Sequence, residues 1–210
     1  MNDTTRRAVL LCSLLAFSLA AAGRDFEDSY QRVRPPQPTL TPSGIEVLEI
    51  FWYGCPHCYS LEPHLEKWLE SKPENVEFVR LPGVLNTSWI PHARAFYTAQ
   101  KLGVLDQIHR PLFDALHRDR KAIFSEGDLR EFFEAHGVDG KEFTRVYHSS
   151  EVETRLKQAL VLARNYKVTG VPALIVNGKY LTSASLAGNH EDMLKVVDRL
   201  VERERLAAAE

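Results

Sequence analysis

Apolar positions recur along this chain with two different periods, and the change from one period to the other marks its elements. Residues 45–51 form a short apolar run rich in branched and aromatic side chains, which predicts a buried strand. Between residues 56 and 71 the apolar side chains recur at helical spacing, so we expect an amphipathic helix that Pro63 bends. Residues 75–81 predict a second strand. A strand, helix and strand of this length form a right-handed crossover, so the two strands should be parallel.

The next part of the chain, residues 87–166, shows helical periodicity and no strand signal. We expect helices near residues 90–102, 108–116 (bent or interrupted by Pro111), 125–136, 140–147 and 151–166. So long a helical stretch between strands is too much for a loop. We therefore predict an all-helical domain at residues 87–166, inserted into a sheet-containing domain.

Strand signals return after residue 170. Two short apolar runs, at 173–176 and 179–181, flank Asn177-Gly178, a dipeptide that favours a tight hairpin turn. A final helix should run from near Asn189 to about Arg205, because its first turn is acidic and its end is basic. These elements predict an α/β fold whose sheet-containing domain consists of residues 45–86 and 167–205.

The first 22 residues have the layout of a cleavable signal peptide. Arg6 and Arg7 form a basic start, and the apolar stretch at residues 8–19 is too short for a comfortable membrane span. Small residues at 20–22 form the cleavage site. We predict export by the general secretory route rather than the twin-arginine route, with cleavage after residue 22.

After cleavage the chain should begin with an extended, proline-rich lead-in at residues 23–44, which contains a short edge strand near residues 30–33. Removal of the signal peptide takes away two arginines and one aspartate, a net charge of +1, and so changes the formal net charge from −2 to −3. This weakly acidic balance favours no nucleic-acid partner, and the mature sequence contains no candidate membrane span.

Cysteine usage points to redox chemistry. Of the three cysteines, Cys12 leaves with the signal peptide, so only Cys55 and Cys58 remain. An exported protein with a single C-x-x-C pair works in an oxidising compartment, here the bacterial periplasm.

The pair lies at the junction of the first strand and the following helix, in the motif Cys55-Pro56-His57-Cys58. The first turn of a helix has unpaired N–H groups and a partial positive charge, which favour a thiolate at Cys55. Pro56 suits the first helical position, and Cys58 follows within reach of a disulfide with Cys55. These positions predict a redox-active dithiol.

Two other interpretations of the C-x-x-C pair were weighed. A zinc site needs two more ligands at knuckle spacing, which the histidines after the motif do not supply, so we expect no metal and no other cofactor. A purely structural disulfide is disfavoured, because such tight loops at helix starts are usually labile.

Two longer motifs add a family resemblance. Residues 51–59 (FWYGCPHCY) and 170–180 (GVPALIVNGKY), together with the order of elements, resemble the thioredoxin fold with a helical insertion, and most closely the DsbA family of periplasmic thiol:disulfide oxidoreductases. The resemblance implies that Cys55 is the exposed nucleophile, Cys58 its buried partner and His57 the residue that tunes the thiolate. It further implies a cis Val171–Pro172 bond beside the dithiol, where Val171, Pro172 and Pro56 would contact substrate.

The resemblance also places a buried acid six residues before the first cysteine, at Glu49. Arg80, on the adjacent predicted strand, is a candidate partner for this carboxylate. Glu49 could move protons for Cys58, with a pKa raised by burial and lowered by Arg80. The alternative is that Glu49 faces solvent.

The function implied is the introduction of disulfide bonds into reduced, unfolded exported polypeptides, with reoxidation by a DsbB-like membrane quinone reductase. We expect a monomer. Two alternatives remain open: a periplasmic disulfide reductase or isomerase, and a peptide-binding chaperone that does not need its thiols.

Overall fold

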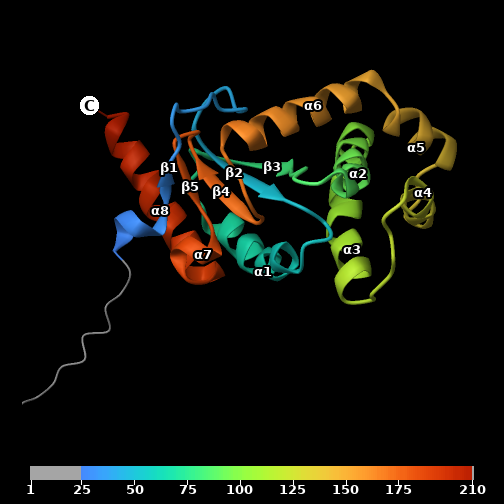
Figure 1. The fold of residues 1–210 in the computed structure, drawn as a ribbon, viewed down its shortest axis with the longest axis horizontal. Coiled ribbons are helices and arrows are strands. Elements are labelled where there is room, and N and C mark those ends of the chain that lie inside the picture. The colour runs from blue at the N-terminus through green and yellow to red at the C-terminus, as the bar shows by residue number, and fades with distance from the viewer. Residues whose placement is uncertain (1–24, 210) are drawn as a thin grey trace, which may run out of the picture.

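The computed structural model describes residues 25–209, so the signal peptide predicted at residues 1–22 lies outside the described residues. Five strands form one sheet in the order β1-β5-β4-β2-β3 (Figure 1). The strands are β1 (Gln31–Arg32), β2 (Ile45–Phe51), β3 (Val76–Pro82), β4 (Ala173–Val176) and β5 (Tyr180–Thr182). As the crossover predicts, β2 and β3 are parallel, and the other neighbouring pairs are antiparallel.

The central strand β2 is buried along its whole length, which explains its continuous apolar sequence. Its side chains alternate between two cores. Ile45 and Val47 pack with helices α1 (Pro56–Ser71) and α8 (His190–Ala207). Leu48 and Ile50 belong to the core that continues into the helices on the other side. The strand therefore joins the two halves of the molecule.

Residues 90–165 form five helices, in agreement with the all-helical insertion predicted from the sequence. They are α2 (Ile90–Leu102), α3 (Leu105–His117), α4 (Glu126–Ala135), α5 (Gly140–Tyr147) and α6 (Ser150–Asn165). In Figure 1 helices α2 to α5 lie beyond one end of the sheet, and α6 runs back across to it. Helix α3 continues through Pro111 without the interruption that was considered.

Several short elements differ from the sequence prediction. The edge strand expected near residues 30–33 is only two residues long in β1. Two 3₁₀ helices, Phe26–Ser29 and Thr87–Trp89, and the four-residue helix α7 (Ala184–Ala187) were not predicted, because they are too short to show a helical period. Between residues 25 and 209 no helix combines the length and the apolar character that a membrane span requires.

The β4–β5 hairpin turns at Asn177 and Gly178, which both have positive φ. A Cβ atom at Gly178 would lie 2.0 Å from the carbonyl oxygen of Gln37, so the lead-in segment packs directly on this glycine. Gly103, at the end of α2, also has positive φ, but a Cβ atom there would meet nothing within 4 Å.

We therefore predict that Gly178→Ala destabilises the protein much more than Gly103→Ala. Both changes place a side chain in the left-handed region, which costs about 1–2 kcal/mol. Only Gly178→Ala also forces the lead-in backbone away. Urea denaturation of both variants provides the measurement, and equal losses of unfolding free energy would contradict the close packing at Gly178.

Candidate active site

The dithiol occupies the turn between β2 and α1. Cys55 is the N-cap of α1, and Pro56 is its first helical residue. The Cys55 N–H donates to the carbonyl oxygen of Trp52 at 3.0 Å. The Trp52 indole lies over Gly54, where a Cβ atom would come within 2.3 Å of the ring. A side chain immediately before the first cysteine would therefore have to displace the Trp52 indole.

The two thiols are free in this structure, and their electrostatic surroundings differ. The pKa of Cys55 is lowered to about 6, chiefly because the side chain of Cys58 donates a hydrogen bond to it. The backbone N–H groups of Cys58 and His57 and the charge of His57 also lower this pKa, whereas burial opposes them. Burial is the main reason why the pKa of Cys58 is raised well above 9, and the neighbouring Cys55 adds to it. At neutral pH the first thiol is mostly ionised and the second is protonated.

Cys55 is less accessible than the sequence led us to expect. Only 7% of its surface is exposed, and Cys58 is fully buried. The expectation of an exposed Cys55 is therefore wrong for this structure. The physical reason is a contact from a distant part of the chain, because the Cys55 Sγ lies 3.4 Å from the carbonyl oxygen of Val171.

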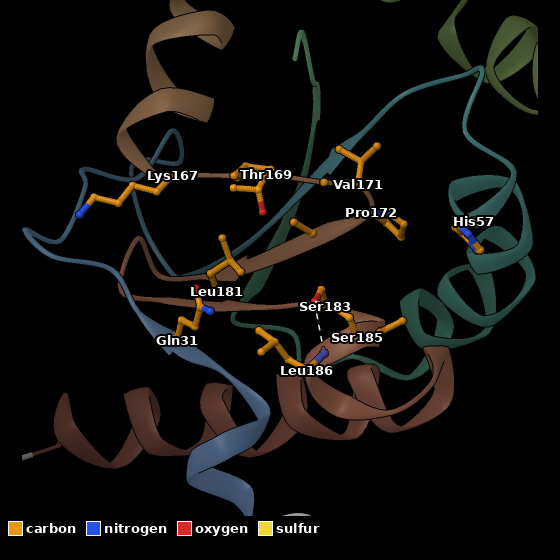
Figure 2. Close-up of a pocket in the computed structure, with 14 residues that line it drawn as sticks. Gln31, His57, Lys167, Thr169, Val171, Pro172, Leu181, Ser183, Ser185 and Leu186 are labelled. Atoms are coloured by element: carbon orange, nitrogen blue, oxygen red, sulfur yellow. Dashed lines mark hydrogen bonds between the residues drawn. The ribbon is translucent and has the colours of Figure 1, made fainter. Parts of the chain in front are cut away.

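The segment that covers Cys55 contains a cis Val171–Pro172 bond, as the resemblance implied. Val171 is half-buried and Pro172 is buried, whereas Pro56 and His57 are exposed. A groove of about 370 Å³ begins at His57 and runs between residues 167–173 on one side and residues 181–186 on the other (Figure 2). An extended peptide bound along this groove would pass beside the dithiol.

Glu49 lies on β2 and is completely buried, so the solvent-facing alternative is excluded. Arg80 stands directly opposite on β3, with its Nε 3.2 Å from the Glu49 Oε2. Burial raises the pKa of Glu49 to about 8; Arg80 opposes this rise and the negative charge of Glu62 adds to it. Glu49 is therefore a carboxyl group that carries a proton at neutral pH.

Glu62 is a second buried acid that the sequence analysis overlooked. Its Oε2 lies 3.2 Å from the Arg80 Nη2, so one arginine serves two carboxyl groups. Burial opposes ionisation of Glu62, but the contact with His109 and the charge of Arg80 outweigh it and lower its pKa. The sequence did contain a signal, because Glu62 follows Cys58 by four residues and so shares its inward helical face.

Tyr53 and His109 complete the buried polar groups around the dithiol. The Tyr53 hydroxyl lies 2.9 Å from the His109 Nδ1, and the His109 Nε2 lies 3.5 Å from the Glu62 Oε1. His109 and His92 both lie in the helical insertion, and both are buried.

Metal binding finds no structural support in the part of the chain that is described. Between residues 25 and 209 no three histidine, cysteine, aspartate or glutamate side chains come together in a way that could hold a metal ion.

Comparisons with known proteins agree with this geometry. Residues 81–195 match the family model described as DSBA-like thioredoxin domain. The chain is 38% identical over 208 residues to the thiol:disulfide interchange protein DsbA of Pseudomonas aeruginosa, with 96% of this chain and 99% of the relative covered. It is 39% identical over 209 residues to the protein of the same name from Bordetella pertussis, with 98% and 100% covered.

Solved structures show the same similarity. The crystal structure of Pseudomonas aeruginosa DsbA superposes with a TM-score of 0.83 at 39% identity, covering 88% of this chain and 96% of that one. The oxidoreductase DsbA from Xylella fastidiosa gives a TM-score of 0.79 at 32% identity, covering 85% and 96%. The thioredoxin-like fold expected from the two motifs is confirmed.

The unequal thiols lead to a labelling prediction. Brief alkylation of the reduced protein at mildly acidic pH should modify Cys55 almost alone, because only its thiolate is populated there. The labelling rate should rise with a midpoint near pH 6. Peptide mass mapping after quenching measures both, and equal labelling of Cys55 and Cys58 would reverse or abolish the assignment of nucleophile and buried partner.

Proposed function

Because this chain belongs to the DsbA family and is a thiol:disulfide oxidoreductase, we propose that it works as an oxidase that introduces disulfide bonds into reduced, unfolded exported polypeptides. The observation that carries the direction is the contrast between the two thiols. Cys55 is stabilised as a thiolate, and Cys58 is held as a thiol. These thiol states stabilise the reduced form relative to the oxidised one, so the oxidised protein readily transfers its disulfide to a substrate.

In the first step a substrate thiolate attacks the Cys55 Sγ of the oxidised protein. A bond forms between the substrate sulfur and Cys55, the Cys55–Cys58 bond breaks, and the electron pair remains on Cys58. Cys58 then takes a proton, because its buried site disfavours the thiolate. The product is a mixed disulfide between substrate and Cys55.

In the second step another substrate thiolate attacks the substrate sulfur of the mixed disulfide. Cys55 leaves as a thiolate, for which a low pKa is an advantage. The substrate has lost two electrons and contains a new disulfide, and the Cys55/Cys58 pair has gained them. His57 supports the Cys55 thiolate, and Pro56, Val171 and Pro172 provide the surface against which the substrate chain lies.

Glu49 is proposed as the proton carrier for Cys58. It gives a proton when Cys58 leaves the disulfide and takes it back when Cys58 attacks. Its position favours this role, since it is buried near Cys58 and its negative charge would raise the pKa of that thiol. A carboxyl group with a pKa of about 8 can act in both directions near neutral pH.

The setting of the reaction is part of the same proposal. The signal-like sequence of residues 1–22 supports a periplasmic location. The reduced protein must be reoxidised, and membership of the family favours a DsbB-like membrane quinone reductase as the acceptor of its electrons. We propose that the protein acts as a monomer and without a cofactor.

The direction of the reaction is tested by stability. We predict that the reduced protein is more stable than the oxidised one at pH 7. The disulfide loop has only two residues between its cysteines, so it removes less entropy from the unfolded chain than the ~2–4 kcal/mol typical of longer loops. The Cys55 thiolate exists only in the reduced form, and each unit by which its pKa is depressed contributes about 1.4 kcal/mol.

The pH dependence has a definite sign. The pKa of Cys55 falls from about 8.5 in the unfolded chain to about 6 in the folded protein. The extra stability of the reduced form is therefore lost as the pH falls through this window, and replacing His57 should reduce it at pH 7. Denaturant melts of both redox forms between pH 5 and pH 8 decide the matter. An oxidised form that is more stable at pH 7 would favour the reductase or isomerase alternative.

A second prediction concerns Glu49. Glu49→Gln should slow the Cys58-dependent resolution of a mixed disulfide roughly a hundredfold, the lower limit of what a positioned acid or base contributes. The pKa of Cys55 should change little. Rapid-mixing kinetics with a cysteine peptide disulfide-bonded to Cys55 measures the rate.

Glu46→Gln is the matched control. Glu46 is also buried on β2, but its Oε2 accepts the backbone N–H groups of Leu40 and Thr41 in the lead-in segment. This variant removes a buried carboxyl group from the same strand without touching the dithiol. Glu49 would be a structural residue if its variant resolved the mixed disulfide as fast as the control.

A further inference from the structure

Five buried or largely buried side chains form a continuous polar path beside the dithiol. It runs from Tyr53 to His109, then to Glu62, Arg80 and Glu49. The successive distances are 2.9 Å, 3.5 Å, 3.2 Å and 3.2 Å. The first and third links are hydrogen bonds, whereas the second and fourth are charge contacts without hydrogen-bond geometry. Tyr53 and Glu49, at the two ends of the path, lie close to Cys55 in the sequence. His109 connects Tyr53 to Glu62 and comes from helix α3 of the helical insertion.

The chemistry of the groups fixes the direction of the contacts. An ionised carboxylate only accepts hydrogen bonds, so the His109 nitrogen that faces Glu62 must be the one that carries hydrogen. Burial is the main cause that lowers the pKa of His109, so the ring is neutral near pH 7 and has a single N–H. The other nitrogen, Nδ1, is then bare and accepts the hydroxyl proton of Tyr53. Tyr53 thereby selects the tautomer that directs Nε2–H towards Glu62.

We propose that His109 is a positioning residue for the thiol–disulfide exchange: its Nε2–H keeps Glu62 ionised, and ionised Glu62 competes with Glu49 for Arg80, so that Glu49 keeps its proton. This inference rests on the proposed role of Glu49 as the proton carrier of Cys58. His109 itself does not touch the reacting sulfur atoms. It acts through two intermediate charged groups, and so couples the helical insertion to the protonation state of the site.

The charges around these groups agree with the proposal. His109 is faced by Glu62 from α1, by Arg80 from β3, by Tyr53 from the dithiol turn and by Arg110 from its own helix. Glu49 is faced by Arg80, Glu62 and Cys58. The Glu62 charge raises the pKa of Glu49, whereas Arg80 lowers it. Any change that protonates Glu62 therefore releases Arg80 to Glu49 and favours ionised Glu49.

Two nearly isosteric variants separate the two contacts of His109. In His109→Asn the amide oxygen can occupy the place of Nδ1 and still accept the Tyr53 hydroxyl, but nothing reaches Glu62. In His109→Gln the amide nitrogen can occupy the place of Nε2 and still donate to Glu62. If the histidine only filled space or supported Tyr53, the first variant would be the milder one. The proposal expects the opposite order.

The experiment uses the mature protein and two readouts. Carboxyl ¹³C NMR titration follows the ionisation of Glu49 and Glu62, and rapid mixing follows the resolution of a mixed disulfide between Cys55 and a peptide as a function of pH. We expect the parent protein to titrate Glu49 near pH 8. In His109→Asn, the Glu49 titration and the midpoint of the resolution rate should both shift to lower pH, and the Glu62 titration should shift to higher pH. His109→Gln should remain close to the parent.

Each result bears on the proposal. Unshifted titrations in His109→Asn, or equal shifts in both variants, would overturn it. The titrations could shift in His109→Asn while the pH dependence of the resolution rate stays the same, and Glu49→Gln could also leave this rate unchanged. In that case Glu49 is not the proton carrier, but the coupling between His109 and Glu49 is supported. Should His109→Asn not fold in a urea melt, Tyr53→Phe replaces it, because loss of the hydroxyl frees the tautomer and should shift Glu49 in the same direction. An unshifted Tyr53→Phe would then overturn the proposal.

Discussion

The structure depends on the complete burial of one strand. β2 has neighbours on both edges and packing on both faces, so its residues have almost no freedom to move. The strand ends at Phe51 and the chain turns directly into α1. Cys55 is therefore fixed at the N-terminus of a helix, where unpaired N–H groups stabilise a thiolate. The strand thereby places the thiol where Cys58 and the N–H groups of the first helical turn lower its pKa.

The same burial raises the free-energy cost of keeping the groups beside the dithiol charged. Glu49 and Glu62 share one arginine. A buried carboxylate that has no cation of its own takes up a proton rather than remain charged. The structure accepts this cost at two positions within a few ångströms of Arg80. Arg80 lowers the pKa of both groups, but burial prevails at Glu49, whereas the contacts with His109 and Arg80 prevail at Glu62. Two coupled groups with pKa values on opposite sides of neutrality are suited to moving protons, because each is sensitive to the charge of the other.

Much of the site could be predicted from the sequence because the signals are local. The strand before Cys55, the proline after it and the Asn177-Gly178 turn are read within a few residues. The family resemblance indicated Glu49, and Arg80 was placed beside it by the neighbouring predicted strand. Glu62 also had a local signal, its helical spacing from Cys58, which was overlooked. The contact between Tyr53 and His109 joins residues 56 positions apart, and no periodicity reports it. The family resemblance placed Val171 and Pro172 beside the dithiol, but no local pattern showed that Val171, 116 residues away, would cover Cys55.

The order of the sheet has a consequence for biogenesis. β2 pairs with β3 through a connection that contains α1, but its other edge is covered only by β4, which follows all five inserted helices. A chain that has emerged as far as the helices would therefore expose a long apolar strand edge, of the kind that pairs with other chains. It would also hold a dithiol without the segment that covers it. A protein of this topology is therefore open to edge-to-edge association until its last forty residues are available to pair with β2.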